Sequence, residues 1–193
     1  MTSDLLPLLG ARRGHFRLES GHHGDLWLDL DSLFARPTRL APFLAALADR
    51  LAAHALDAIA GPLTGGAFVG FAVAARLDLR FVPAERHAGA GAIRYRIPDP
   101  LRPDLAGLRF AVVDDVINAG SAASATCADL RSLGADVRAL GALAVLGDRA
   151  SRLGLPIETT LALDNALWSP AECPLCSAGT PLEDLVPSSS ASP

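Results

Sequence analysis

The stretch that decides the fold is residues 110–122, FAVVDDVINAGSA. Its first four residues are apolar and suit a strand that is buried on both faces. Asp114 and Asp115 follow this run, and neither carboxylate can be buried without a partner. The small residues that come next, with Ser121 as a candidate N-cap, let an anion approach backbone N–H groups at the start of a helix. Paired carboxylates followed by an anion loop predict a site for a ribose that carries a 5-phosphate.

Other readings of this stretch fit less well. The plain alternative is a strand that ends in two aspartates and an ordinary turn, but the order of all 13 residues favours the phosphate site. The stretch is not a P-loop, because it lacks the GK[ST] signature, and it is not a dinucleotide fingerprint, because no GxGxxG follows the strand.

Along the rest of the chain, apolar runs alternate with helical patterns. This alternation predicts an α/β fold with a doubly wound, mostly parallel sheet. Ligands bind such sheets beyond the carboxyl ends of the strands, which places residues 61–66, 114–122 and 148–149 at one rim. The expected strands are 56–62, 79–85, 108–116, 137–146 and 156–163; the expected helices are 3–10, 36–54, 65–77, 121–135 and 148–154, with an irregular hairpin at 11–31.

Length and composition narrow the class of protein. A chain of 193 residues suits one domain, expected over residues 1–186, and the Ser/Pro-rich residues 187–193 are expected to be disordered. The net charge of −4 does not suggest a partner such as nucleic acid or an acidic membrane surface, which attract positively charged proteins. No secretory or membrane-spanning segment is evident, so we expect a cytoplasmic protein.

Residues 84–106 lack clear periodicity and are expected to form a flexible functional flap.

The central motif resembles the phosphoribosyl-pyrophosphate motif of the type I phosphoribosyltransferases. Three further segments resemble the orotate phosphoribosyltransferases among them, and the likeness extends over roughly residues 5–165. These segments are GHFRLESGHHGDLWLD near the N-terminus, DAIAGPLTGGAFVGFAVAARL before the flap, and VLGDRASRLG after the motif. The resemblance implies the type I phosphoribosyltransferase fold, with residues 1–35 and the flap forming a small hood.

The resemblance also implies a role for each matching position. Asp114 and Asp115 would hold the ribose hydroxyls, and Arg149 would clamp a carboxylate of the base. Asn118 and Trp27 would also contact the base; a surface charge for Arg149 and a hairpin anchor for Trp27 are the alternatives. The 5-phosphate would lie against Asn118, Ala119, Gly120, Ser121 and Ala122, and the pyrophosphate against Leu63, Thr64, Gly65 and Gly66.

The chain departs from the family in having no lysine, since all 17 basic residues are arginine. Gly65 stands where the family has a pyrophosphate-loop lysine, and His23 stands near a second lysine position. In the flap, the candidates for neutralising the leaving group are Arg86, His87, Arg94 and Arg96, and His87 alone among them titrates near neutral pH. We assign catalysis to Asp114, Asp115, His87 and Arg86; a solvated hairpin is the alternative for the flap.

Cys173 and Cys176 have the spacing of a metal knuckle. A structural zinc ion needs four ligands, and this pair supplies two. His22 and His23, or a second copy of the chain, would have to supply the others, so we favour isolated reduced thiols.

The resemblance implies transfer of ribose 5-phosphate from phosphoribosyl pyrophosphate to orotate, with Mg²⁺ as the cofactor and a homodimer as the assembly. Orotidine 5-phosphate and pyrophosphate would be the products, as in pyrimidine biosynthesis. Two alternatives remain open, a purine-type phosphoribosyltransferase and a non-catalytic regulator that binds phosphoribosyl pyrophosphate or a nucleotide.

Overall fold

The computed structural model describes residues 5–18, 21–30, 32–89 and 92–184. The expected disordered tail, 187–193, and the start of the helix expected at 3–10 lie outside these ranges. The chain divides into two compact units, one formed by residues 36–163 and the other by residues 1–35 together with 164–193. The second unit thus combines the predicted N-terminal hood segment with the C-terminal segment, which the sequence had not linked to it.

The larger unit is built on a six-stranded sheet with the order β5-β4-β3-β6-β7-β8. All neighbouring strands are parallel except β4 and β5, which form an antiparallel hairpin. The doubly wound, mostly parallel sheet predicted from the sequence is therefore confirmed. The strands are β3 (Ala58–Pro62), β4 (Arg80–Gly89), β5 (Ala92–Arg96), β6 (Arg109–Ile117), β7 (Asp136–Leu146) and β8 (Ile157–Leu163).

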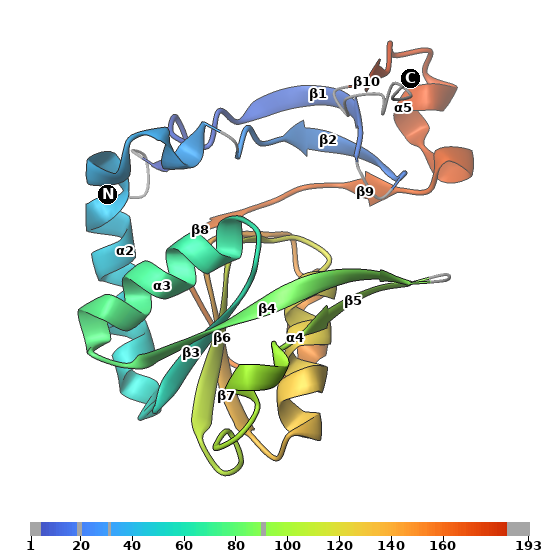
Figure 1. Ribbon diagram of the computed structural model, residues 1–193. Coiled ribbons are helices and arrows are strands. Elements are labelled where there is room, and N and C mark those ends of the chain that lie inside the picture. The colour runs from blue at the N-terminus through green and yellow to red at the C-terminus, as the bar shows by residue number, and fades with distance from the viewer. Residues whose placement is uncertain (1–4, 19–20, 31, 90–91, 185–193) are drawn as a thin grey trace, which may run out of the picture. The chain divides into compact units, whose positions relative to one another are not determined.

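Helices cover both faces of this sheet (Figure 1). Helices α2 (Pro37–Leu51) and α3 (Gly65–Leu77) lie on one face, and α4 (Ser121–Ser132) lies on the other. Pro37 occupies the first turn of α2, as expected, because a residue there needs no N–H for the helix. The larger unit also contains the short 3-10 helices η2 (Ala52–His54), η3 (Asp99–Leu101) and η4 (Arg149–Leu153).

Small and branched side chains build the core of the larger unit, as the composition suggests. Strand β6 is buried on both faces from Phe110 to Asp115, so a continuous apolar run is needed there. Gly141 of β7 allows close packing, because a Cβ at that position would lie 2.9 Å from Leu51 Cδ1. Helix α2 therefore packs closely against β7 at this position.

The smaller unit is a four-stranded sheet with the order β10-β1-β2-β9. β1 (Arg12–Arg17) and β2 (His23–Trp27) form the hairpin expected at 11–31, with an irregularity between Arg13 and Phe16. β9 (Leu167–Trp168) and β10 (Glu183–Asp184) come from the C-terminal segment. That segment also contains η5 (Pro170–Glu172) and the one-turn helix α5 (Pro174–Ser177). The N-terminal segment of this unit ends with the 3-10 helix η1 (Leu33–Ala35).

Candidate active site

The strand order of the larger sheet reverses direction between β3 and β6. The chain moves from β3 outward to β4, and then from β6 in the opposite direction to β7 and β8. Doubly wound sheets bind ligands at such a switch point, in the crevice beyond the carboxyl ends of the two strands. The two loops that leave these strands are residues 63–64 and 118–120, so the predicted pyrophosphate and phosphate loops lie at the switch point.

The loop after β3 is held against the neighbouring strand β4. The Leu63 N–H donates to the Ala84 carbonyl of β4 at 2.7 Å, and Leu63 itself is exposed. Helix α3 begins at Gly65, so the N–H groups of Gly65 and Gly66 belong to its first turn, where donors lack partners within the helix. These donors and the positive end of the helix dipole suit an anion.

Gly66 also allows the start of α3 to approach β6 closely. A Cβ at Gly66 would lie 2.5 Å from Asp114 Oδ1 and 3.1 Å from Asp114 Cα. Gly61 is confined in the same way, since its Cβ would lie 2.8 Å from the Gly66 carbonyl oxygen. Both glycines are therefore required by the packing that brings the first loop against the carboxylate.

Asp114 and Asp115 are buried side by side near the end of β6, each less than a tenth exposed. Asp114 Oδ1 accepts from the Asp115 N–H at 3.0 Å, and Asp115 Oδ1 accepts from the Val116 N–H at 2.8 Å. Burial raises the pKa of Asp114, and the charge of Asp115 raises it further. Burial likewise raises the pKa of Asp115. Ionising both carboxylates in this buried site is costly. A ligand that brings hydroxyl donors or positive charge would stabilise their ionised form, so the pair suits such a ligand.

The loop after β6 turns into α4 at Gly120, which has a φ of 76°. Gly120 is the N-cap residue and Ser121 is the first helical residue, without a side-chain capping bond, so the predicted N-cap role of Ser121 is wrong. The reason is the left-handed turn, which a glycine adopts without strain. Ala119 and Ser121 are exposed and small, so side chains leave the N–H groups at the start of α4 accessible.

Arg149 and Asn118, predicted separately to contact the base, lie together. The Arg149 guanidinium donates to Asn118 Oδ1 at 2.7 Å. Arg149 is the first residue of η4 and lies one strand further along the sheet than Asn118. Arg149 is half-buried at the start of η4, next to the phosphate loop, and its contact with a base stays a prediction.

The predicted flap contains a regular β-hairpin, where the sequence suggested a loop. Ala84 pairs with Pro62, the last residue of β3, so the hairpin that follows extends beyond the rim that carries the first loop. Glu85 lies opposite Arg96 and His87 lies opposite Arg94. Strand side chains alternate between faces, so His87 and Arg86 point to opposite sides of the hairpin. The sequence predicted β4 only as far as residue 85 and missed its continuation and β5, because glycine and alanine alternate there with few apolar residues.

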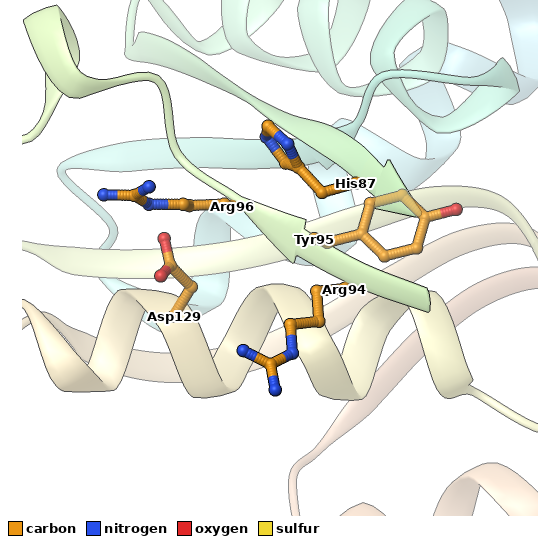
Figure 2. A pocket seen from close by; sticks show the side chains of 5 residues that line it. All are labelled: His87, Arg94, Tyr95, Arg96 and Asp129. Atoms are coloured by element: carbon orange, nitrogen blue, oxygen red, sulfur yellow. The ribbon is translucent and has the colours of Figure 1, made fainter. Parts of the chain in front are cut away.

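Figure 2 shows the side chains around a hollow of about 430 Å³ between this hairpin and α4. It is lined by His87, Arg94, Tyr95, Arg96 and Asp129. Asp129 points from α4 toward Arg96, and it accepts from the Ile97 N–H at 2.8 Å. His87 Nε2 lies 3.6 Å from Glu85 Oε2. The hollow therefore gathers three of the four candidate side chains of the flap, His87, Arg94 and Arg96, on one side.

In the smaller unit, Trp27 packs against Phe16, with ring centroids 6.3 Å apart. This contact fits the hairpin-anchor alternative, and contact with a base stays a prediction. The same unit brings His15 and His23 next to Cys173 and Cys176. His15, and not His22, is the second histidine of this group. A signal was available in the sequence, since two histidines of one hairpin can share a face.

Comparison with known proteins identifies the relatives of this chain. It is 31% identical to an orotate phosphoribosyltransferase of Caldanaerobacter subterraneus subsp. tengcongensis over 88% of this chain and 87% of the relative. It is 32% identical to an orotate phosphoribosyltransferase of Thermotoga petrophila over 95% of this chain and 96% of the relative. The chain belongs to the orotate phosphoribosyltransferase family. No protein-family model matches it.

Solved structures agree with the family. The crystal structure of orotate phosphoribosyltransferase from Aeropyrum pernix matches with a TM-score of 0.68 and 25% identity, over 84% of this chain and 93% of that one. Adenine phosphoribosyltransferase from Thermoanaerobacter pseudethanolicus has a TM-score of 0.63 at 23% identity, over 71% of this chain and 88% of that one, and so shows the shared fold. The predicted type I phosphoribosyltransferase fold is thus confirmed. Within the described part of the chain, no helix is both long and apolar enough to cross a bilayer.

Proposed function

We propose that this member of the family transfers ribose 5-phosphate from phosphoribosyl pyrophosphate to orotate. The bond between the ribose C1 and the pyrophosphate oxygen breaks, and pyrophosphate leaves with the electron pair. A ring nitrogen of orotate forms the new bond to C1 and loses its proton, which gives orotidine 5-phosphate. The observation that carries this proposal is the meeting of two anion loops, paired carboxylates and the Arg149–Asn118 pair at one switch point.

The donor half of the proposed site comes from β3, β6 and the helices that follow them. The N–H groups at the start of α4, from Ala119 to Ala122, hold the 5-phosphate. In the loop of Leu63, Thr64, Gly65 and Gly66, the N–H groups of the two glycines hold the pyrophosphate, because those of Leu63 and Thr64 are bonded to the carbonyls of Ala84 and Pro62. Asp114 and Asp115 accept from the ribose hydroxyls. As C1 becomes electron-poor in the transition state, the negative charge of this pair stabilises it.

The acceptor half depends on Arg149. A guanidinium binds a carboxylate through two parallel hydrogen bonds, and orotate carries a carboxylate that purine bases lack. The Asn118 amide orients the guanidinium through the 2.7 Å contact, and its N–H₂ group can donate to a pyrimidine oxygen. We favour orotate over a purine for this reason.

The leaving pyrophosphate needs positive charge, and the chain has no lysine to supply it. We assign this task to Arg86, Arg94 and Arg96 of the flap. We assign protonation of the pyrophosphate to His87, because an imidazole can give up a proton whereas a guanidinium stays charged. The buried carboxylates Asp114 and Asp115 fit a hard cation, whose preferred ligands are oxygens. Mg²⁺ held near them would lower the charge of the pyrophosphate when bound.

A homodimer, also implied by the family resemblance, gains support from α3. Phe68 and Phe71 are 65% and 62% exposed on this helix, and Leu63 at its start is 55% exposed. Large apolar side chains that gather on one element of a folded unit are typical of an interface. Sedimentation equilibrium of the wild type and of Phe71→Ser would test whether this face joins two copies.

The test of the reaction follows the loss of orotate absorbance in the presence of phosphoribosyl pyrophosphate and Mg²⁺. We expect turnover by the wild type, and a fall in kcat/KM for orotate of roughly 100-fold or more in Arg149→Ala, because a charge-assisted pair is lost. Binding of phosphoribosyl pyrophosphate, measured by calorimetry, should remain. The matched control is Arg152→Ala, which removes an exposed arginine from the same 3-10 helix.

Three outcomes would contradict parts of the proposal. Turnover with adenine or hypoxanthine but not with orotate would favour the purine alternative. Binding of phosphoribosyl pyrophosphate without turnover on any base would favour the regulator. Full activity of Arg149→Ala with orotate would remove the carboxylate clamp from the mechanism.

A further inference from the structure

Four side chains that can bind a metal converge in the smaller unit, and none of them is among the groups assigned to the reaction. They are His15 of β1, His23 of β2, and Cys173 and Cys176 at the two ends of the CPLC sequence. One potential ligand atom of each lies within 4.8 Å of those of the other three. The first three residues are buried, and Cys176 is exposed.

The distances match the edges of a tetrahedron around one ion. Tetrahedral zinc, with bonds of about 2.3 Å to sulfur and 2.0–2.1 Å to nitrogen, places neighbouring ligand atoms about 3.3–3.8 Å apart. His15 Nε2 lies 3.2 Å from His23 Nδ1 and 3.3 Å from Cys173 Sγ. Cys176 Sγ lies 3.7 Å from His15 Nε2 and 3.2 Å from His23 Nδ1. Four of the six distances between ligand atoms therefore lie within a few tenths of an ångström of the tetrahedral values, and the other two are no longer than 4.8 Å.

The orientation of His15 favours a metal over a hydrogen-bonded cluster. Its Nδ1 lies 2.9 Å from the Thr180 carbonyl oxygen, which can only accept, so Nδ1 carries the proton. In the neutral ring Nε2 then has a single lone pair, yet it faces His23 and both cysteines. A cation at the centre would use that lone pair and those of the other three atoms together. A carbonyl that accepts from the second ring nitrogen is the usual support of a metal-bound histidine.

Backbone hydrogen bonds also fix the segment that carries the two cysteines. Helix α5 begins directly after Cys173, and the Ser177 N–H donates to the Cys173 carbonyl at 3.2 Å. The Thr180 N–H donates to the Leu175 carbonyl at 2.9 Å, which fixes the turn that presents the carbonyl group of Thr180 to His15. This local structure places both sulfur atoms on one side, facing the hairpin.

We propose that His15, His23, Cys173 and Cys176 bind one structural Zn²⁺ ion. Two thiolates and two imidazoles are a ligand set that zinc prefers and that Mg²⁺ and Ca²⁺ do not. Four protein ligands leave no open position for a substrate, so the ion does not take part in the reaction. This replaces the reading of the cysteines as isolated thiols.

The proposed ion would join two segments that are 150 residues apart in the chain, counted from His23 to Cys173. Within this unit, β10 pairs with β1 through two residues and β9 pairs with β2 through two. Such short strands contribute little, and small units often depend on a metal or a disulfide for stability. The metal would therefore fix the C-terminal segment to the N-terminal hairpin.

The first test measures metal in the full-length protein purified without chelators. We expect about one zinc per chain by mass spectrometry. Replacement with Co²⁺ should give the absorption of tetrahedral cobalt with a thiolate charge-transfer band, which reports the ligands without any variant. Cys173→Ser with Cys176→Ser should lose the metal and lower the Tm by more than about 5 °C.

The matched control is His22→Gln, which changes the histidine next to His23 and should keep one zinc per chain. His15→Gln should lose the metal, since His15 faces the other three ligands. If a double cysteine variant does not fold, the cobalt spectrum of the wild type still decides the question. A wild type that binds neither zinc nor cobalt, or whose two cysteines are isolated as a disulfide, would overturn the proposal.

Discussion

Replacing Gly66 by alanine tests whether the close approach of α3 to β6 positions the carboxylate Asp114. The new Cβ would lie 2.5 Å from Asp114 Oδ1, 3.1 Å from Asp114 Cα and 3.0 Å from Pro62 Cδ. Rotation of the Asp114 side chain can relieve the first contact. The other two involve a backbone atom and a proline ring, so the start of α3 must also move by a few tenths of an ångström.

Both adjustments act on the proposed site. Overpacking of this kind costs about 1–3 kcal/mol, which for a chain of this length lowers the Tm by roughly 2–12 °C. Displacement of a catalytic group by about 1 Å can lower the rate by about 100-fold. We therefore expect kcat/KM with orotate and phosphoribosyl pyrophosphate to fall by about 10- to 100-fold, as measured by the loss of orotate absorbance.

The control is Gly70→Ala, one turn further along α3. Its Cβ would meet Phe81 Cε2 at 2.9 Å, and this ring edge can shift without moving β6. Both changes gain the same helix propensity, about 1 kcal/mol, so their difference isolates the contact with Asp114. A Gly66→Ala enzyme that matches Gly70→Ala in both Tm and kcat/KM would refute the reasoning.

Two further predictions concern pH and charge. Burial and Asp115 raise the pKa of Asp114, so its charged form destabilises the fold as pH rises above its usual pKa. Asp114→Asn should therefore abolish transfer while raising the free energy of unfolding near neutral pH in urea titrations; a loss of stability there would contradict this. Hydrogen bonds from Arg109 lower the pKa of Asp57, with oxygen–nitrogen distances of 2.7 and 2.8 Å. This contribution is lost as pH falls below about 4, so the wild type should lose stability on acidification more steeply than Asp57→Asn, and parallel curves would exclude it.

Some of the site could be read from the sequence because it is local. Strand β6, the two aspartates and the loop that starts α4 are consecutive, so their order alone indicated a phosphate site at a strand end. The same holds for residues 58–77, where β3, its loop and α3 occur as expected. The hairpin of the flap was harder to predict from the sequence, because the pairing of β4 with β5 depends on cross-strand contacts more than on the local β-propensity of its residues.

The sequence by itself determined the alternation of strands and helices, and with it the doubly wound sheet, because local periodicity carries that information. It also allowed the two anion loops to be predicted, since the residues of each motif are continuous. Only the tertiary structure decided which distant side chains meet. Asn118 meets Arg149 because parallel β6 and β7 end at the same rim, and His15 meets Cys173 because the two ends of the chain fold into one unit. Contacts across 31 and 158 residues leave no periodic trace in a single sequence. The proposed base-binding pair was therefore predicted only as separate residues, and the proposed set of four metal ligands was not predicted.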